Sequence, residues 1–453
     1  MRNWDESMFA VNAYEMLHNK KFFSYYYEGH PDLLNTKPPL IIWLQLLFIK
    51  LIGYNEMAIR LPSAIAGAMC IIIIFLFADK RYGRTTAWLC ALTLLTSQGF
   101  VYFHSARGGE ADELLALFTL LAGLQLINYT TSRKNKYVFY TLTFITLAAC
   151  TKLYAGLLFV PAYVLILILH RCFRNFVLNW HFVSGMFLFA FSIVSIIYLR
   201  ELDTPGYIHE ITHKDVARIG VPIENHAHAW NFYLDNLSSF RFTFWFIPLI
   251  ISALFVLWKF KTGDATQRDI LLLIMAYISI ISLSVTKLEW YDVPLYPFFA
   301  LLVGFWLNKL FFTTFFINDE SRNKTAFSAL LFLYPYWYMF RTTQDCSLPE
   351  SHKKMELNER YLFLKSQNHE NINGLKVFHY QYNGAMLFYK YKFAEAGQKI
   401  ELCRNPDFKM GDRVLLSDDT LYDVLSSRFK FTIEEEQKPL RVLKIGNPRE
   451  EKD

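Results

Sequence analysis

The chain has 453 residues, of which 53% are hydrophobic and 17% aromatic, including 42 Phe and 27 Tyr. These fractions exceed those of soluble globular proteins and exclude a water-soluble domain of ordinary composition. The formal net charge of +6 lies largely in loops between apolar segments, so it indicates membrane orientation and does not argue for nucleic-acid binding.

Ten apolar segments approach the length of about 20 residues that crosses a bilayer. They lie at about 61–78, 84–103, 114–129, 137–151, 153–169, 177–199, 242–258, 271–286, 292–308 and 326–340. The sequence therefore predicts a polytopic bundle of membrane helices. The segment 40–53 is shorter and carries Lys50, so we interpret it as an interfacial or re-entrant helix. If it crosses instead, the topology shifts by one span.

With segment 40–53 outside the count, the basic loops share one side, which the positive-inside rule makes cytoplasmic. These loops are 80–84, 133–136, 171–174, 259–268 and 309–324. The other side receives 1–60, 106–113, 201–241, 287–291 and the C-terminal tail. Residue 1 then lies outside the cytoplasm with no apolar segment before it, and we expect an upstream transmembrane helix of about 20 residues in the natural coding sequence.

The composition changes after Arg341, where the chain becomes charged and polar. Short alternating runs near 375–380 and 413–416 predict strands, and Asp419 predicts the cap of a helix between strands. We therefore divide the chain into a membrane domain, residues 1–341 with an outward catalytic loop at 1–60, and a small extracytoplasmic α/β domain, residues 342–453.

Asp5 and Glu6 precede a segment in which Phe9, Ala13 and Met16 recur at helical spacing. A carboxylate beside a membrane can accept the proton of an attacking hydroxyl or amine, and partial desolvation raises its basicity. The alternative is an ordinary helix cap, because acidic residues favour the first turn of a helix.

Lys37 precedes Pro38 and Pro39 at the start of segment 40–53. Proline stiffens the first turn of a helix, and a lysine there combines its own charge with the helix dipole. This combination suits a phosphate group. The alternative is a lysine that extends toward the membrane interface without binding a ligand.

A second acidic cluster follows the span 84–103. Glu110, Asp112 and Glu113 come just after Arg107 and two glycines. Charged groups at a membrane boundary are costly unless they are paired or functional. Asp112 is therefore a candidate to bind an acceptor, a metal ion or the Asp5 region, with helix capping as the alternative.

Two further loops carry cations and histidines. Lys287 and Tyr291 are candidates to complete an anion site, and the loop 201–241 carries Arg218. The same loop contains His226 and His228, which do not share a helix face at this spacing, so a metal site there is the lesser alternative.

Taken in order, these segments resemble the polyprenyl-phosphate-sugar-dependent glycosyltransferases of the GT-C superfold, in the group that holds the protein O-mannosyltransferases and the lipid A aminoarabinose transferase. The resemblance covers residues 1–310 and lies in 5–6, 36–40, 54–63, 107–112, 150–152 and 287–294. It implies that Asp5 is the catalytic base, with Glu6 and Asp112 as further acidic residues of the site. It implies that Lys37 contacts the lipid phosphate. The other substrate-binding candidates are Arg107, Glu110, Arg218, Lys287 and Tyr291.

The resemblance implies a mainly α polytopic membrane bundle of GT-C type and an inverting glycosyltransferase, either hexosyl- or pentosyl-. Its donor is a polyprenyl-phosphate sugar, and its acceptor is a protein Ser/Thr or a lipid or glycan outside the cytoplasm of a bacterium, at the inner membrane. Membrane lipids are the remaining partners and nucleic acid is not one. No cofactor is assigned, and a divalent metal ion is left open.

A transporter or flippase of polyprenyl-linked glycans is the alternative from a different class. Transporters place their ionisable residues near the middle of the bilayer, whereas the acidic residues of this sequence cluster at one face. That distribution favours the enzyme.

Overall fold

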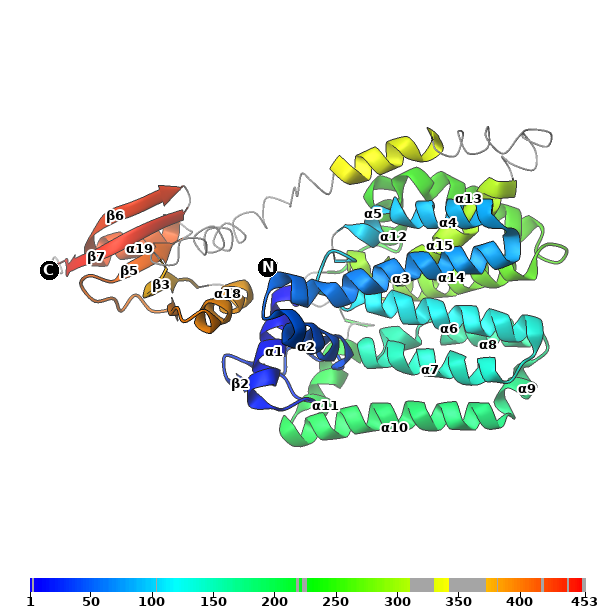
Figure 1. The fold of residues 1–453 in the computed structure, drawn as a ribbon, viewed down its shortest axis with the longest axis horizontal. Helices are drawn as coiled ribbons and strands as arrows, with labels where there is room; N and C mark the ends of the chain where they lie inside the picture. Colours follow the sequence, from blue (N-terminus) through cyan, green and yellow to red (C-terminus); the bar gives the residue numbers. More distant parts are fainter. Residues whose placement is uncertain are drawn as a thin grey trace.

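The computed structural model describes residues 1, 4–102, 104–216, 220–221, 226–309, 330–341, 372–380, 382–416, 419–437 and 440–449. Arg218 lies outside these residues, as does the first part of the predicted span 326–340; residues 330–341 are helical. The described residues form a long bundle of helices with a small sheet domain beyond one end (Figure 1).

Among the described residues, five helical segments are long and apolar enough to cross a membrane. They are α3 (Glu56–Tyr82), α6 (Asp112–Ser132), α10 (Trp180–Asp203), α14 (Ala265–Leu283) and the continuous segment Glu289–Leu307, made of η5 (Glu289–Leu295) and α15 (Tyr296–Leu307). Each corresponds to one of the ten spans that the sequence predicts. The chain is thus an integral membrane protein.

The other predicted spans form shorter helices, and irregular turns interrupt two of their apolar segments. Segment 84–103 divides into α4 and α5 around Ser97, and a 3₁₀ turn opens the segment that ends in α8. These helices are α4 (Arg84–Leu95), α5 (Gln98–Val101), α7 (Lys136–Thr151), η1 (Ala155–Leu157), α8 (Val160–Leu169) and α13 (Thr243–Trp258). The short connecting helices are α9 (Phe173–Val177), α11 (Tyr207–Glu210), η2 (Ile211–Val216), α12 (Phe232–Asn236) and η4 (Leu237–Arg241).

Helix ends follow local sequence rules. The Asn55 side chain caps α3 by accepting a hydrogen bond from the Ala58 amide, and α3 ends at Gly83, whose φ of 87° favours glycine.

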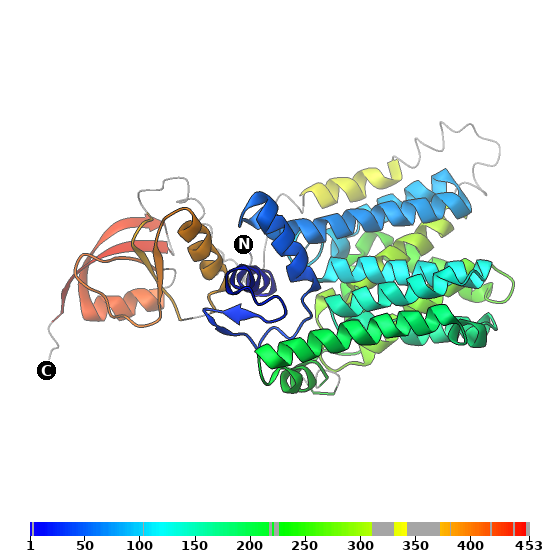
Figure 2. The same ribbon diagram turned by 60° about the horizontal axis from the view of Figure 1, so that its bottom comes forward.

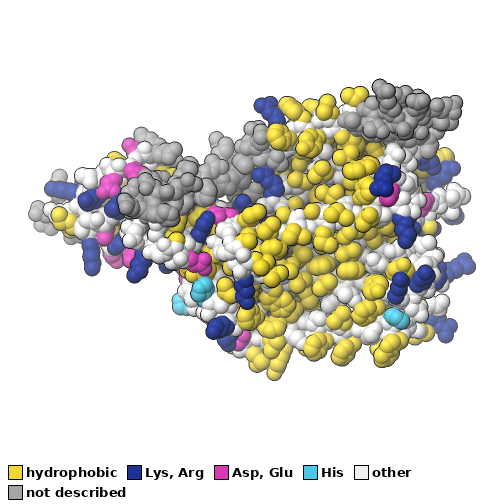
Figure 3. Space-filling view, viewed as in Figure 1, with side chains coloured by type: hydrophobic (Ala, Val, Ile, Leu, Met, Phe, Trp, Pro, Cys, Tyr) yellow, Lys and Arg dark blue, Asp and Glu magenta, His cyan; other side chains and the backbone are white. Residues whose placement is uncertain are grey.

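Exposed hydrophobic side chains cover the middle of the bundle and basic side chains lie toward its ends (Figure 3). This distribution is typical of a surface that faces lipid between two aqueous sides.

Two helices lie at the end of the bundle nearest the sheet domain (Figures 1 and 2). They are α1 (Asp5–Asn19) and α2 (Leu40–Ile52), joined through the short hairpin of β1 (Tyr26–Tyr27) and β2 (His30–Pro31). At 13 residues α2 is about 20 Å long. That length is short of the roughly 30 Å hydrocarbon core, which supports the interfacial interpretation.

The described residues of the C-terminal domain contain a five-stranded sheet in the order β4-β3-β5-β7-β6. Strand β3 runs parallel to β4 and β5, whereas β7 runs antiparallel to β5 and β6. Its elements are β3 (Leu375–Phe378), α18 (Gly384–Glu395), β4 (Ile400–Cys403), β5 (Arg413–Leu416), α19 (Asp419–Arg428), β6 (Phe429–Gln437) and β7 (Leu440–Pro448). The predicted small α/β domain is therefore confirmed, whereas its boundary at residue 341 stays a prediction.

Helix α18 joins the sheet domain to α1. The Tyr391 hydroxyl donates to a Glu15 carboxylate oxygen at 2.6 Å, and the rings of Tyr391 and Tyr14 stack with centroids 4.4 Å apart. Lys392 also pairs with Glu56 at the start of α3, at 2.7 Å. The sheet domain is thus attached to the helix that begins with Asp5.

Candidate active site

Asp5 and Lys37 form an ion pair at the end of the bundle. Asp5 is the first residue of α1, Lys37 lies just before α2, and Lys37 Nζ is 3.3 Å from Asp5 Oδ2. Burial acts to raise the pKa of Asp5, but the positive charges of Lys37, His104 and Lys152 outweigh it and lower the pKa to about 2. Both side chains remain partly open to solvent, with 28% of Asp5 and 20% of Lys37 exposed.

The backbone at Lys37 is held by a buried arginine that the sequence analysis missed. The Arg200 guanidinium, at the end of α10, lies 3.9 Å from the ring centroids of both Tyr25 and Tyr207. It donates a hydrogen bond to the Lys37 carbonyl at 2.9 Å, and the Tyr25 hydroxyl donates to the same carbonyl at 2.9 Å. The Tyr207 hydroxyl donates to the Thr36 carbonyl. These contacts fix the loop from which the Lys37 side chain reaches Asp5.

Glu6 has different contacts from its neighbour. Its carboxylate is fully buried, receives hydrogen bonds from Arg60 Nε at 2.6 Å and Nη2 at 2.9 Å, and accepts the Gly109 amide at 3.0 Å. A Cβ at Gly109 would lie 2.6 Å from an Ile59 side-chain carbon, so only glycine allows this approach. Glu6 therefore joins α1 to α3 and to the loop before α6.

Asp112 is paired with a lysine. It opens α6, is buried, and lies 2.6 Å from Lys152 Nζ at the end of α7. The ammonium of Lys152 also lies 5.6 Å from the centroid of the Tyr291 ring. Because Lys152 acts on the pKa of Asp5, the two predicted acidic residues Asp5 and Asp112 share one electrostatic cluster. In the sequence, Lys152 is indicated only by its place in the family segment 150–152.

His104 belongs to the same cluster, although the sequence analysis did not name it. It is buried, its Nδ1 lies 3.0 Å from Glu110 Oε2, and its ring stacks on Trp290 with centroids 3.8 Å apart. Burial acts to lower the pKa of His104, but the carboxylates of Glu110, Asp5 and Asp112 raise it above its ordinary value. The one available signal was a titratable side chain in the loop just before Arg107.

Two other predicted site residues, Arg107 and Lys287, differ in burial and in their contacts. Arg107 is partly buried in the loop that also carries His104 and Glu110. Lys287 is buried and its Nζ donates to the backbone carbonyls of His228, at 2.9 Å, and Ser284, at 2.5 Å. Burial lowers the pKa of Lys287. These contacts show Lys287 joining two loops.

Metal binding gains no support from the described residues. Within them, no group of three or more His, Cys, Asp or Glu side chains is placed to hold an ion. The cluster around Asp5 instead alternates acids with cations, the acids being Asp5, Glu110 and Asp112 and the cations Lys37, Lys152 and His104.

A helical membrane bundle with this cluster at one end and a sheet domain beside it matches the GT-C class that the sequence predicted. The structure superposes on the crystal structure of ArnT from Cupriavidus metallidurans bound to undecaprenyl phosphate with a TM-score of 0.71. The match covers 98% of this chain and 94% of that chain at 15% sequence identity. This likeness confirms the fold.

Sequence comparisons identify similar proteins. Residues 36–198 match the family described as dolichyl-phosphate-mannose-protein mannosyltransferase. The chain is 25% identical over 332 residues to an uncharacterized protein of Aquifex aeolicus, covering 73% of this chain and 62% of that protein. It is 28% identical over 125 residues to the undecaprenyl phosphate-alpha-4-amino-4-deoxy-L-arabinose arabinosyl transferase of Pseudomonas savastanoi pv. phaseolicola, covering 28% and 22%.

The chain thus spans less than two thirds of the length of these two curated relatives. Together with the fold, the matches confirm the resemblance to the polyprenyl-phosphate-sugar-dependent GT-C glycosyltransferases.

Proposed function

We propose that this protein is a membrane glycosyltransferase that transfers a sugar from a polyprenyl phosphate to an acceptor, with inversion at the anomeric carbon. The observation that carries the proposal is the Asp5–Lys37 pair at the end of the bundle. A carboxylate beside a cation supplies the two functions that the reaction needs: a base for the acceptor and a positive charge for the leaving phosphate.

The reaction is a single in-line displacement. The acceptor hydroxyl or amine attacks the anomeric carbon while the bond from that carbon to the phosphate oxygen breaks. Asp5 accepts the acceptor's proton, and the bonding electron pair leaves with the polyprenyl phosphate. Lys37 stabilises the charge that develops on the leaving phosphate.

The low pKa of Asp5 gives the donor a second role. A carboxylate with a pKa of about 2 is a weak base while Lys37 pairs with it. A donor phosphate within reach of Lys37 competes with Asp5 for the ammonium, and burial then acts to raise the pKa of the freed carboxylate. Donor binding therefore activates the base, and without donor the base stays weak.

The other acidic residues have supporting roles in this proposal. Glu6 positions α1 through Arg60, so we assign it to positioning and leave proton transfer to Asp5. Asp112 holds Lys152 near Asp5, and Glu110 holds His104. These contacts keep the positive charges facing the base and the phosphate.

The remaining substrate-binding candidates divide between the cluster and its surroundings. Arg107 and Tyr291 remain candidates to contact substrate, because Arg107 shares the loop of His104 and Tyr291 lies beside Lys152. Lys287 is hydrogen-bonded to two backbone carbonyls. We therefore assign it to holding two loops together and not to substrate binding. Arg218 stays a prediction.

An aromatic pair beside Asp5 offers a surface for the acceptor. Trp4, one residue before Asp5, is 51% exposed and stacks on Tyr382 of the sheet domain with centroids 4.9 Å apart and planes within 1°. Exposed aromatic faces pack against the apolar face of a sugar ring. This favours a lipid or glycan acceptor over a protein Ser/Thr, and gives the sheet domain a part in acceptor choice.

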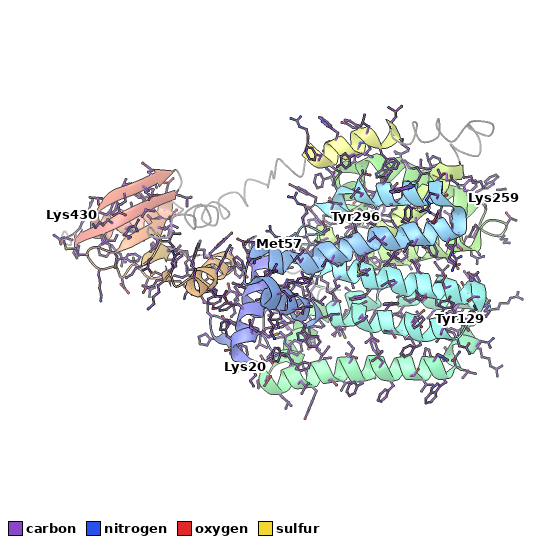
Figure 4. The ribbon with its side chains drawn as sticks, viewed as in Figure 1. Lys20, Met57, Tyr129, Lys259, Tyr296 and Lys430 are labelled. Carbon is purple, nitrogen blue, oxygen red and sulfur yellow. The ribbon has the colours of Figure 1, made fainter. Side chains whose placement is uncertain are left out.

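We place the site and the sheet domain on the extracytoplasmic side of a bacterial inner membrane. The support is the positive-inside rule: the basic loop that includes Lys259 lies at the end of the bundle away from Lys20 and Met57 (Figure 4). The acidic cluster near one end, and not at mid-bundle, argues against a transporter or flippase.

The test uses membranes that contain the full chain. A panel of labelled polyprenyl-phosphate hexoses and pentoses is supplied, and label is followed into protein, lipid and glycan fractions. We expect label to move from one donor, and to stop moving in Asp5→Asn but not in the matched control Asp235→Asn, an exposed carboxylate that bonds Asn231. Transfer that is equal in membranes with wild type and Asp5→Asn would contradict the proposal.

A further inference from the structure

One face of α1 carries Asp5, Phe9 and Asn12, which follow one another at intervals of four and three residues. Side chains at these intervals are neighbours on a helix surface. Lys37 Nζ lies 3.3 Å from Asp5 Oδ2 and 4.9 Å from the centroid of the Phe9 ring. The Lys37 side chain therefore lies along the first turns of the helix that carries the proposed base.

Asn12 bonds the same face of α1 to the loop that carries Lys37. Its Oδ1 accepts a hydrogen bond from Asn35 Nδ2 at 2.8 Å, and Asn35 Oδ1 accepts one from the Lys37 backbone amide at 3.2 Å. Asn12 Nδ2 donates to Asp32 Oδ2 and to the Tyr26 carbonyl, each at 2.9 Å. Two hydrogen bonds in series thus connect α1 with the backbone of Lys37.

The side chains of this connection are buried: Asn12 is 0% exposed, Asn35 1% and Asp32 5%. A buried hydrogen bond contributes little net stability, and apolar replacements of the same shape can be nearly neutral. What a bonded polar group adds is direction, because its donor and acceptor atoms must meet at a defined distance and angle. The pattern therefore indicates a role in placing Lys37.

Arg200 holds the same loop to a different helix. Its guanidinium, at the end of α10, donates to the backbone carbonyls of Asp32, Asn35 and Lys37. This clamp fixes the loop relative to α10, but it does not by itself fix Lys37 relative to Asp5, which belongs to α1. The hydrogen bonds of the two asparagines join the loop directly to α1.

We propose that Asn12 and Asn35 are positioning residues of the transfer reaction, which hold the Lys37 backbone on the helix that carries Asp5. The inference rests on the proposed function, in which Asp5 is the base and Lys37 contacts the leaving phosphate. Neither asparagine is assigned a contact with substrate, and both act through Lys37. With its backbone held, only the Lys37 side chain turns between Asp5 and the donor phosphate.

The test measures kcat/KM of the purified full chain for the labelled polyprenyl-phosphate sugar from the panel that supports transfer. We expect Asn35→Ala to lower kcat/KM by about 10- to 100-fold, because misplacement of a catalytic group by about 1 Å can cost 10²-fold. The double variant Asn35→Ala/Lys37→Met should match Lys37→Met alone, since Asn35 acts only through Lys37. A role in loop stability alone would make the two losses multiply.

Asn128→Ala is the matched control. Asn128 is partly buried in α6, and its Oδ1 accepts a hydrogen bond from Arg81 Nη2 of α3 at 3.0 Å, so this change also removes an amide that bonds another segment. The next residue, Tyr129, lies at the end of the bundle away from Lys20 and Met57 (Figure 4). The value of kcat/KM for Asn128→Ala should equal that of wild type.

The acid limb of the kcat/KM profile is a second readout, which a loss of folded protein does not move. The positive groups that lower the pKa of Asp5 are Lys37, His104 and Lys152. Asn35→Ala loosens Lys37 and leaves the other two in place. Its acid limb should therefore move to higher pH, but no further than that of Lys37→Met, and the control should keep the wild-type limb.

Asn35→Ser keeps the test valid if Asn35→Ala folds poorly. A serine hydroxyl can accept a hydrogen bond from the backbone amide two residues on, but it is too short to reach Asn12, so the change removes only the bond to α1. It should lower kcat/KM as far as Asn35→Ala does.

The outcomes separate this inference from the proposed function. Wild-type kcat/KM in Asn35→Ser, or losses that multiply in the double variant, would overturn the inference while Asp5 and Lys37 keep their roles. Wild-type kcat/KM in Lys37→Met, or transfer from no donor of the panel, would contradict the proposed function and the inference with it.

Discussion

Lys37 and Asp5 are 32 residues apart in the sequence, and their charged groups are 3.3 Å apart in the structure. The contact depends on two separately anchored segments: Arg200 clamps the backbone of Lys37, and Arg60 holds α1 through Glu6. A phosphate that draws Lys37 away from Asp5 would change the pKa of the base without any movement of the helices. The ion pair can therefore couple donor binding to base strength.

Asp5→Asn is expected to lower the turnover number by about 10²–10⁴-fold, because the amide keeps the shape of the side chain and cannot accept the proton. The donor KM should not rise and is expected to fall, because the neutral amide no longer competes with the donor phosphate for the Lys37 ammonium. Initial rates with saturating labelled donor measure the effect, with the thermal midpoint as a check on folding. Turnover within a few-fold of wild type would leave Asp5 as a helix-cap residue only.

Lys37→Met is expected to raise the donor KM and to move the acid limb of the pH profile of kcat/KM for the donor, which reports the donor-free enzyme, to higher pH. Burial acts to raise the pKa of Asp5, and the positive charges that lower it to about 2 include that of Lys37. Without the Lys37 ammonium, less positive charge opposes the effect of burial, and the pKa of Asp5 rises. Asp5 is then protonated at a higher pH than in wild type. Activity profiles between pH 3 and pH 8 check this, with Lys37→Arg as the variant that keeps the charge.

An unchanged acid limb in Lys37→Met would show that Asp5 is not the group whose protonation stops the reaction. An unchanged donor KM would instead show that Lys37 does not contact the phosphate.

The membrane helices and several members of the site could be predicted from the sequence. Apolar length alone located α3, α6, α10 and α14, because crossing a bilayer demands it. Asp5, Lys37 and Asp112 followed from the order of short motifs, and the structure brings them into one cluster.

Other members of the site could not be predicted, because their roles come from contacts between distant segments. Arg200 lies just beyond a predicted span and 163 residues from Lys37, so nothing local indicates that it holds the Lys37 loop. His104 acquires its role from Glu110 and Trp290, which only folding brings against its ring. Glu6 resembles a second base in sequence, but its burial against Arg60 is visible only in the structure.

Arg60→Met is expected to destabilise the fold by about 2–3 kcal/mol, because it leaves the fully buried carboxylate of Glu6 without its charged partner. We place the effect below that of a wholly buried pair because 36% of the Arg60 side chain is exposed. Thermal midpoints in one detergent measure it. Adding Glu6→Gln should recover part of the loss, since the unpaired charge is then removed.

Arg84→Met is the matched control for Arg60→Met. Arg84 pairs with Asp79 at 3.4 Å, but 69% of its side chain is exposed, and such surface pairs contribute little. A midpoint for Arg60→Met that equals that of Arg84→Met would mean that Glu6 does not depend on Arg60 for its burial.

His104→Gln is expected to remove a pH dependence of stability. The carboxylates around His104 raise its folded-state pKa above the ordinary 6.5, against the effect of burial. Protonated His104 therefore stabilises the fold fully below pH 6.5, and this contribution is lost as the pH rises through the folded-state pKa. The thermal midpoint of wild type should fall over that range more steeply than that of His104→Gln. His18→Gln, which changes an exposed histidine of α1, is the control and should keep the wild-type slope. Parallel curves for wild type and His104→Gln would exclude a charged His104 from the cluster around Asp5.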